Sequence, residues 1–194
     1  MVIKLGITGG IGSGKSVVSH LLQVMGIPVY IADDESKRLT ESDIFIIDQL
    51  RSLYGKDIYQ NGKLNKSLLA SFIFNDPLQA AKVNEIIHPQ VRADLRNWFV
   101  AHNSNDIVAM ESAILVEAGF ISEIDYLVMV DAPLEVRLNR VIKRDSSSKE
   151  LVMSRIKSQM DNEKKKEYAK FIINNDDECL LIPQITALIK QLQL

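Results

Sequence analysis

The 194-residue sequence has a single cysteine, Cys179, so no internal disulfide can form, and such usage is typical of a reducing compartment. No apolar run approaches the roughly 20 residues that a membrane-spanning helix needs. A net charge of −2 disfavours a general nucleic-acid binder. The first residues form a predicted core strand, so we expect no signal peptide. From these absences we expect a cytoplasmic protein with neither a membrane nor a nucleic-acid partner.

The composition is that of an ordinary globular protein. Hydrophobic residues make up 46% of the chain and charged residues 25%, which suffices for one domain with insertions. Strands are predicted wherever a short apolar run occurs between helical stretches, at residues 2–8, 27–31, 106–110, 126–130 and 171–173. Because strands alternate with helices, the sequence predicts an α/β fold with a five-stranded parallel sheet and right-handed crossovers.

The most informative segment is Gly9-Gly10-Ile11-Gly12-Ser13-Gly14-Lys15-Ser16, which matches a phosphate-binding loop (P-loop). Glycines let backbone N–H groups point at phosphate oxygens, and the following helix adds its N-terminal partial positive charge. Lys15 can reach the β- and γ-phosphates of ATP, and the Ser16 hydroxyl can hold Mg²⁺. The alternative, a flexible glycine turn with an unrelated lysine, does not explain the order strand, loop, helix. The residues expected to bind ATP here are Gly10, Ile11, Gly12, Ser13, Gly14, Lys15, Ser16 and Val17.

Two acidic residues follow predicted strands, where ligands of open α/β sheets bind. Asp33 follows the second strand, which we expect beside the first, and its carboxylate either meets the substrate or caps a helix from Ser36. Asp34 is the other candidate for either role. Glu111 ends the third strand and is a candidate ligand of Mg²⁺, directly or through water.

Residues 36–103 are predicted to be helical, with no confident strand. Asn65 and Asp76 are expected to cap two of the helices, and His88-Pro89 to break another. Nearly seventy helical residues exceed a plain crossover, so this region is predicted to be a substrate-binding insertion. His88 either touches the substrate or is a buried structural histidine, and both interpretations stay open.

Positive charge gathers late in the chain. Residues 137–170 hold eleven Lys or Arg and five Asp or Glu. This segment is either a solvated helix face or a surface that closes over polyphosphate. Arg140 is the main candidate for contact with the transferring phosphate, with Arg144 and Arg155 as weaker ones. All three arginines of the predicted helix from Leu134, including Arg137, are expected on faces away from the core.

The motifs that are present or absent distinguish between classes of P-loop protein. A guanine-nucleotide switch would carry Asp-x-x-Gly and Asn-Lys-x-Asp motifs, and the sequence has neither. A P-loop, a helical insertion and a basic late segment are typical of a kinase of a small molecule. The competing class is a noncatalytic nucleotide-binding regulator.

The ordered set of motifs resembles the dephospho-CoA kinase family almost from end to end. The matching segments are Gly6-Ile7-Thr8 with the loop, Ala32-Asp33, Leu69-Ala70-Ser71-Phe72-Ile73-Phe74, His88-Pro89, Leu115-Val116-Glu117, Val130-Asp131-Ala132-Pro133, Arg140, Lys143-Arg144-Asp145, Arg155-Ile156, Gln159-Met160 and Asn175. Three positions depart from the family: Ile31 stands for a frequent Asp, Ala113 for a usual Pro and Lys170 for a usual acid.

The resemblance implies ATP-dependent phosphorylation of the ribose 3′-hydroxyl of dephospho-CoA, the last step of coenzyme A synthesis. It also implies a P-loop NTPase core at residues 1–35, 104–140 and 168–194, a helical CoA-binding region at about 36–103 and a lid at about 141–167. Asp33, Lys15 and Arg140 are the implied catalytic residues, and Arg144 and Asn175 would join the loop in binding ATP. Contacts with dephospho-CoA are expected from Asp33, His88, Glu111, Glu117 and Arg155, and contacts with Mg²⁺ from Ser16 and Glu111. We expect a monomer or a weak homo-oligomer.

Overall fold

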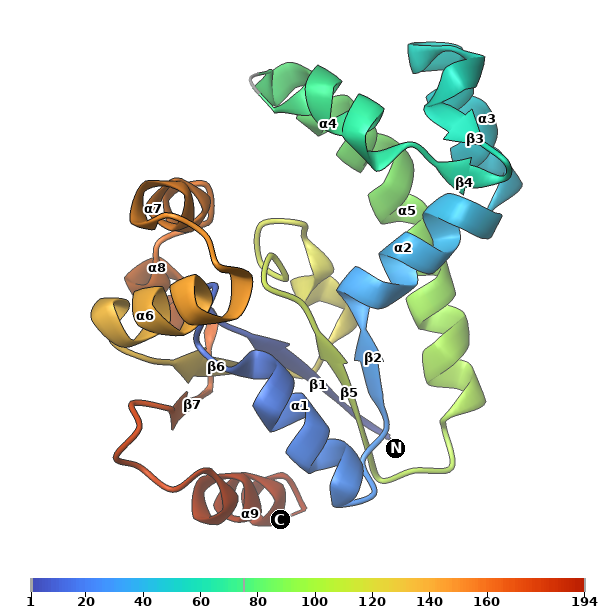
Figure 1. The fold of residues 1–194 in the computed structure, drawn as a ribbon. Helices are drawn as coiled ribbons and strands as arrows, with labels where there is room; N and C mark the ends of the chain where they lie inside the picture. The colour runs from blue at the N-terminus through green and yellow to red at the C-terminus, as the bar shows by residue number, and fades with distance from the viewer. Residues whose placement is uncertain (1, 75, 194) are drawn as a thin grey trace. The chain divides into compact units, whose positions relative to one another are not determined.

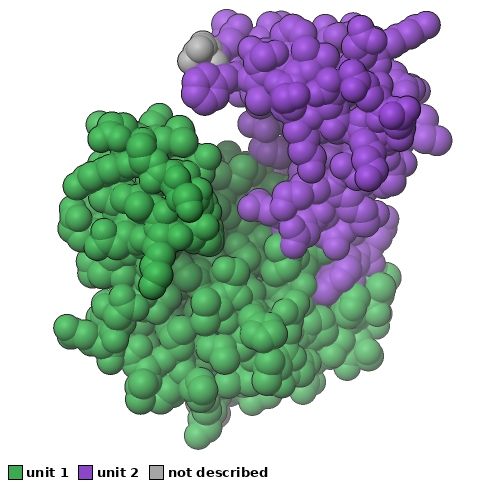
Figure 2. Space-filling view, in the orientation of Figure 1, with its two compact units in different colours: residues 1–31, 99–194 green, residues 32–98 purple. Residues whose placement is uncertain are grey.

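The structure is a computed structural model that describes residues 2–74 and 76–193. It contains two compact units, which Figures 1 and 2 display. We call residues 1–31 and 99–194 the sheet unit, and residues 32–98 the helical unit.

The sheet unit contains a parallel sheet of five strands, which confirms the predicted fold class. Its strands are β1 (Ile3–Thr8), β2 (Val29–Ile31), β5 (Ile107–Glu111), β6 (Tyr126–Asp131) and β7 (Phe171–Asn174). Their order is β2-β5-β1-β6-β7. The expectation that the second strand lies beside the first is therefore wrong, because β5 lies between them. All five residues of β5 are buried, as in a central strand, whereas the three-residue β2 lies at an edge.

Two helices cover one face of this sheet. Figure 1 shows α1 (Lys15–Val24) and α9 (Leu181–Leu192) on the same side, and both contribute to one hydrophobic cluster with the strands. Its buried members are Leu5, Ile7, Val18, Leu22, Ile27, Val29, Ile107, Ala109, Val128, Val130, Ile173, Ile185, Leu188 and Leu192. Since Leu5 and Ile7 alternate with Gly6 and Thr8, β1 is buried on both faces.

The remaining elements of the sheet unit follow β5 and β6. They are a 3₁₀ turn η2 (Phe120–Glu123) and the helices α6 (Leu134–Asp145), α7 (Lys149–Lys157) and α8 (Asn162–Tyr168). A second, smaller apolar cluster joins α6 to α7 through Leu138, Val141 and Val152. Within residues 2–74 and 76–193, no helix combines the length and apolar character needed to cross a membrane.

The described residues of the helical unit form four α-helices, a 3₁₀ turn and a short hairpin. Its elements are α2 (Ala32–Ser42), α3 (Ile44–Tyr54), η1 (Lys56–Ile58), β3 (Tyr59–Gln60), β4 (Lys63–Leu64), α4 (Lys66–Ile73) and the start of α5 (Pro77–Ala101). The two predicted caps are confirmed. Asn65 Oδ1 accepts from the backbone N–H of Leu68 at 3.1 Å, and Asp76 Oδ1 accepts from that of Gln79 at 3.1 Å.

Two local predictions in this unit are wrong. The helix predicted from Ser36 begins at Ala32, so Asp33 and Asp34 lie in its first turn and neither residue precedes the helix as a cap. Acidic side chains in a first turn are favoured by the helix dipole, which explains the earlier start. The hairpin between β3 and β4 was not predicted, although Asn61 and Gly62 have the positive φ values, 51° and 78°, of a two-residue turn.

The predicted break at His88-Pro89 is also wrong, since α5 runs through Pro89 without interruption. Pro89 has no N–H to donate to the carbonyl of Glu85, and this loss normally disfavours a helix interior. Packing outweighs that local cost. A stripe of buried apolar residues continues on both sides of the proline, at Val83, Ile87, Val91 and Leu95.

We predict that Pro89→Ala stabilises the protein. Pro89 is exposed, so alanine creates no cavity, and its N–H can complete the helical ladder. The expected gain is about 1–3 kcal/mol in the free energy of unfolding. Denaturant unfolding of the helical signal measures it, with the exposed Glu85→Ala as a control that should change little. An unfolding midpoint at or below that of the parent would contradict the prediction.

Candidate active site

The P-loop connects β1 to α1 and takes its shape from its own backbone. The N–H of Ser13 donates to the carbonyl of Gly10 at 3.1 Å and closes a turn, in which Gly12 has a φ of +79°. Gly14, with a φ of +91°, immediately precedes α1. Within the described residues no side chain caps the start of α1. The start of α1 thus has the form of a helix N-terminus that binds an anion instead of a capping side chain.

Lys15 curls back over the loop. Only 9% of the residue is exposed, and its Nζ donates to the carbonyl of Gly9 at 3.0 Å and to that of Gly10 at 3.5 Å. The charge of Lys15 thus lies against the same turn whose backbone donors are expected to hold phosphate. This arrangement fits the predicted role of Lys15 at a phosphate chain.

Two predicted ligands from the last third of the chain reach the loop. Asn175 follows β7, and its Nδ2 donates to the carbonyl of Ser13 at 2.8 Å. Arg140 of α6 donates from Nη1 to the carbonyl of Gly12 at 3.4 Å and from Nη2 to Asn175 Oδ1 at 3.4 Å. Arg140 also forms an ion pair with Asp177. The structure therefore brings Arg140 and Asn175 together at the P-loop.

The other two predicted arginines gather around a different residue. Arg144 donates to Asp145 at 2.7 Å, and Arg155 lies 3.3 Å from the same carboxylate. The hydrogen bond from Arg144 lowers the pKa of the Asp145 carboxyl from its ordinary value. In this conformation the partner of both arginines is thus a carboxylate at the end of α6.

The predicted acidic residues occupy different environments. Glu111 ends β5, pairs in register with Ile7 of β1, and is 8% exposed. Glu117 instead accepts from the backbone N–H of Met160 at 3.0 Å and forms an ion pair with Lys165 at 2.8 Å. Glu117 therefore holds the start of the segment that leads into α8, and its contact with substrate stays a prediction.

Two predicted substrate residues belong to the helical unit. Asp33 is exposed in the first turn of α2, and its neighbour Asp34 forms an ion pair with Lys37 at 2.9 Å. His88 is partly buried in α5. Burial, and then the charge of Arg92, lower the pKa of His88 from its ordinary value, so the neutral imidazole is favoured.

Arg137 lies at the loop, although the sequence predicted it on an outward face of its helix. The residue is 7% exposed, its Nε donates to the carbonyl of Ala132 at 3.1 Å, and burial lowers its pKa from the ordinary value. A Cβ atom added to Gly10 would collide with Arg137 Nη1 and with Asn162 Oδ1. Arg137 and Asn162 thus cover Gly10, and no local sequence pattern signals this long-range contact.

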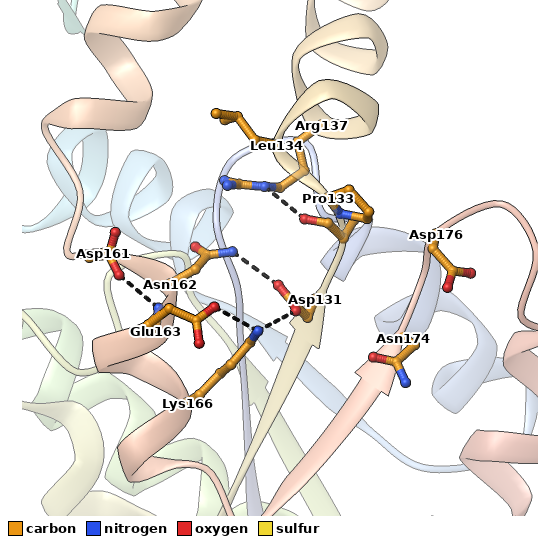
Figure 3. Close-up of a pocket in the computed structure, with 11 residues that line it drawn as sticks. Asp131, Pro133, Leu134, Arg137, Asp161, Asn162, Glu163, Lys166, Asn174 and Asp176 are labelled. Atoms are coloured by element: carbon orange, nitrogen blue, oxygen red, sulfur yellow. Dashed lines mark hydrogen bonds and ion pairs between the residues drawn. The ribbon is translucent and has the colours of Figure 1, made fainter.

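A polar cavity of about 480 Å³ adjoins these two residues (Figure 3). Its lining comes from the ends of β6 and β7, the start of α6, and α8. Asp131 accepts from Asn162 at 3.2 Å and pairs with Lys166 at 2.7 Å, as the dashed lines in Figure 3 show. These contacts tie α8 to the sheet at the same edge as the P-loop.

The donor set around the loop fits a metal bound together with a nucleotide. No group of three His, Cys, Asp or Glu side chains that could hold an ion occurs among the described residues. Mg²⁺ at phosphates needs few protein ligands because phosphate oxygens and water complete its shell. The hydroxyls of Thr8 and Ser13 are buried without a hydrogen-bond partner in the described part of the chain, so the loop has unsatisfied hydrogen-bonding groups that a bound ligand could satisfy.

Fold and loop together define a P-loop nucleotide-binding protein of the α/β class. Comparison with protein families then gives the particular group. The family model described as dephospho-CoA kinase matches residues 3–180, and the chain belongs to that family.

Individual relatives agree with this membership. A dephospho-CoA kinase from Bacteroides fragilis (strain YCH46) is 54% identical over 189 residues, which are 97% of this chain and 92% of the relative. The crystal structure of TT1252 from Thermus thermophilus is similar with a TM-score of 0.83 and 31% identity, over 99% of this chain and 96% of that one. A dephospho-CoA kinase from Campylobacter jejuni shares the fold, with a TM-score of 0.71 and 23% identity over 100% of this chain and 96% of that one.

We predict that Gly14→Ala damages the loop far more than Gly26→Ala. Both glycines have positive φ, +91° and +85°, so each substitution costs about 1–2 kcal/mol of backbone strain. Only Gly14 is also crowded, because its new Cβ would collide with Asn175 Nδ2, whereas Gly26 has open space. Thermal unfolding and ADP titration should show a larger loss of stability and of affinity for Gly14→Ala. Equal effects of the two substitutions would contradict the proposed packing of Asn175 on the loop.

Proposed function

We propose that this protein transfers the γ-phosphoryl group of ATP to the ribose 3′-hydroxyl of dephospho-CoA, giving CoA and ADP. The observation that carries the proposal is the family match over residues 3–180, together with a complete P-loop inside the matched range. The relatives align with nearly the whole chain, so the aligned region includes both the sheet unit and the helical unit.

The phosphate chain of ATP is proposed to lie in the P-loop. Backbone N–H groups of the loop and of the first turn of α1 would donate to its oxygens. The ammonium of Lys15, now held by the carbonyls of Gly9 and Gly10, has the length and charge to move onto the β- and γ-phosphates. There it would offset the negative charge that develops during transfer.

Arg140 and Asn175 are proposed to hold the nucleotide beside the loop. Arg140 is partly exposed and shared between Asp177 and Asn175, so phosphate oxygens can replace an exposed carboxylate as its partner. Arg144 and Arg155 would join when the proposed lid, at about 141–167, closes. Closure would exclude water, which otherwise competes with the acceptor hydroxyl.

Mg²⁺ is the proposed metal, with Ser16 as ligand and Glu111 binding it directly or through water. When bound, it neutralises negative charge on the phosphate oxygens. The Ser16 side chain is exposed at the start of α1, and Glu111 ends the strand that pairs with β1. Both positions are thus at the carboxyl edge of the sheet.

Asp33 is proposed to orient the 3′-hydroxyl and to accept its proton as the new O–P bond forms. The carboxylate of Asp33 forms no ion pair within the described residues, whereas Asp34 is engaged by Lys37. The start of α2 at Ala32 removes the rival role of Asp33 as a helix cap. We also propose that the helical region at about 36–103 binds the rest of dephospho-CoA, with His88 among its contacts.

An ATP assay with a panel of acceptors tests the proposed function. ADP release should require dephospho-CoA and Mg²⁺, and the product should be CoA. Adenosine, AMP and shikimate should give little turnover at the same concentration. Equal turnover with shikimate or AMP, or none with dephospho-CoA, would overturn the assignment of the acceptor.

We predict that Asp33→Asn lowers kcat by roughly 10²–10⁴-fold, because an amide cannot accept the proton. Thermal stability and ATP affinity should stay close to the parent, since Asp33 is exposed and pairs with no cation of residues 2–74 and 76–193. The matched control is Asp34→Asn, which breaks a surface pair worth at most about 1 kcal/mol and should leave turnover nearly unchanged. Parental turnover by Asp33→Asn would exclude Asp33 as the base.

A further inference from the structure

One donor of the P-loop is occupied by a side chain from the distant segment between α7 and α8. The backbone N–H of Ile11 donates to Oε1 of Gln159 at 3.0 Å, across 148 positions of sequence. Ile11 is the second residue of the turn that the bond from Ser13 to Gly10 closes. The orientation of its peptide plane therefore sets the direction in which the following N–H groups of the loop point.

The side chain of Ile11 makes a second contact with the same region. It is partly buried against the apolar cluster of Leu138, Val141 and Val152, which joins α6 to α7. Ile11 is thus held on its polar side by Gln159 and on its apolar side by residues of α6 and α7. Both contacts lie within the sheet unit.

Gln159 is itself held in place by its neighbours. The next residue, Met160, donates its N–H to Glu117 at 3.0 Å. Lys165 is fully buried and lies 2.8 Å from Glu117 and 2.6 Å from the carbonyl of Ala113. These contacts fix the joint between α7 and α8 to the chain that follows β5, so the amide of Gln159 starts from an anchored backbone.

We propose that Gln159 is a positioning residue that holds the turn of the P-loop in its phosphate-binding shape and couples this turn to α7. Gln159 acts through Ile11, and its own amide does not touch the phosphate. The rate of phosphoryl transfer depends more steeply on the geometry of the loop N–H donors than ground-state binding of the nucleotide does. Removing the amide oxygen of Gln159 should therefore lower mainly kcat. The kinetic consequence rests on the proposed function, whereas the hydrogen bond can be measured without any acceptor substrate.

The main variant is Gln159→Met, which keeps the length of the side chain and its packing but removes the amide oxygen. Amide hydrogen exchange, followed by NMR, should show that protection of the Ile11 N–H falls at least tenfold in this variant. The value of kcat with dephospho-CoA should fall about ten- to a hundredfold. The KM for dephospho-CoA and the affinity for ADP should stay within about threefold of the parent.

Two further variants separate positioning from general damage. Gln159→Glu keeps an acceptor oxygen at the same length, so protection of Ile11 should return and kcat should exceed that of Gln159→Met. Ser158→Ala is the neighbouring control, because the Ser158 hydroxyl donates to the carbonyl of Arg155 in the last turn of α7. This control should match the parent in exchange and in kinetics.

The proposal is overturned if Gln159→Met leaves Ile11 protection unchanged, or if kcat does not fall although protection is lost. It is also overturned if stability and ADP affinity fall while KM rises, which would indicate a purely structural role. A parent protein that does not phosphorylate dephospho-CoA would refute the proposed function, while exchange at Ile11 would still decide whether Gln159 holds the loop.

Discussion

The structure depends on holding a glycine-rich backbone in one shape. Glycine lets N–H groups approach phosphate closely, but it also gives the chain many alternative conformations. Contacts from far along the sequence restrict this freedom. Ser13 is held by Asn175 across 162 positions, Gly12 by Arg140 across 128, and Ile11 by Gln159 across 148. The last third of the chain therefore orders a loop near its beginning.

Sheet topology makes these distant contacts possible. β1 is central, and β6 pairs with it on the side opposite β5, so Thr8 lies next to Met129. β7 pairs in turn with β6, and the N–H of Asn175 donates to the carbonyl of Asp131 at 2.8 Å. Because all these strands are parallel, their carboxyl ends share one edge. The residues that follow β6 and β7 are thereby delivered to the loop that follows β1.

Local features could be predicted from the sequence, whereas long-range ones could not. The strands, the P-loop and the caps at Asn65 and Asp76 depend on neighbouring residues, and the structure bears them out. The place of β5 between β2 and β1 depends on which strands pair with one another across long stretches of sequence. Continuity of α5 through Pro89 depends on packing along both flanks. The Asn-Gly turn between β3 and β4 is an exception, since Asn61-Gly62 is a local turn signal.

The site residues divide along the same line. Lys15 could be placed from its motif, whereas burial of Arg137 over Gly10 follows only from the meeting of α6 with the loop. The fully buried Lys165 is the sharpest case, because sequence alone gives a lysine in a basic run. Burying a charge is costly, and its pair with Glu117 is weak grounds for stability. What the pair does provide is a fixed geometry, since Glu117 also accepts from Met160. The buried pair thus fixes the backbone at Met160. Gln159 immediately precedes Met160, so its amide oxygen lies where it accepts from the N–H of Ile11 and helps the loop to keep its shape.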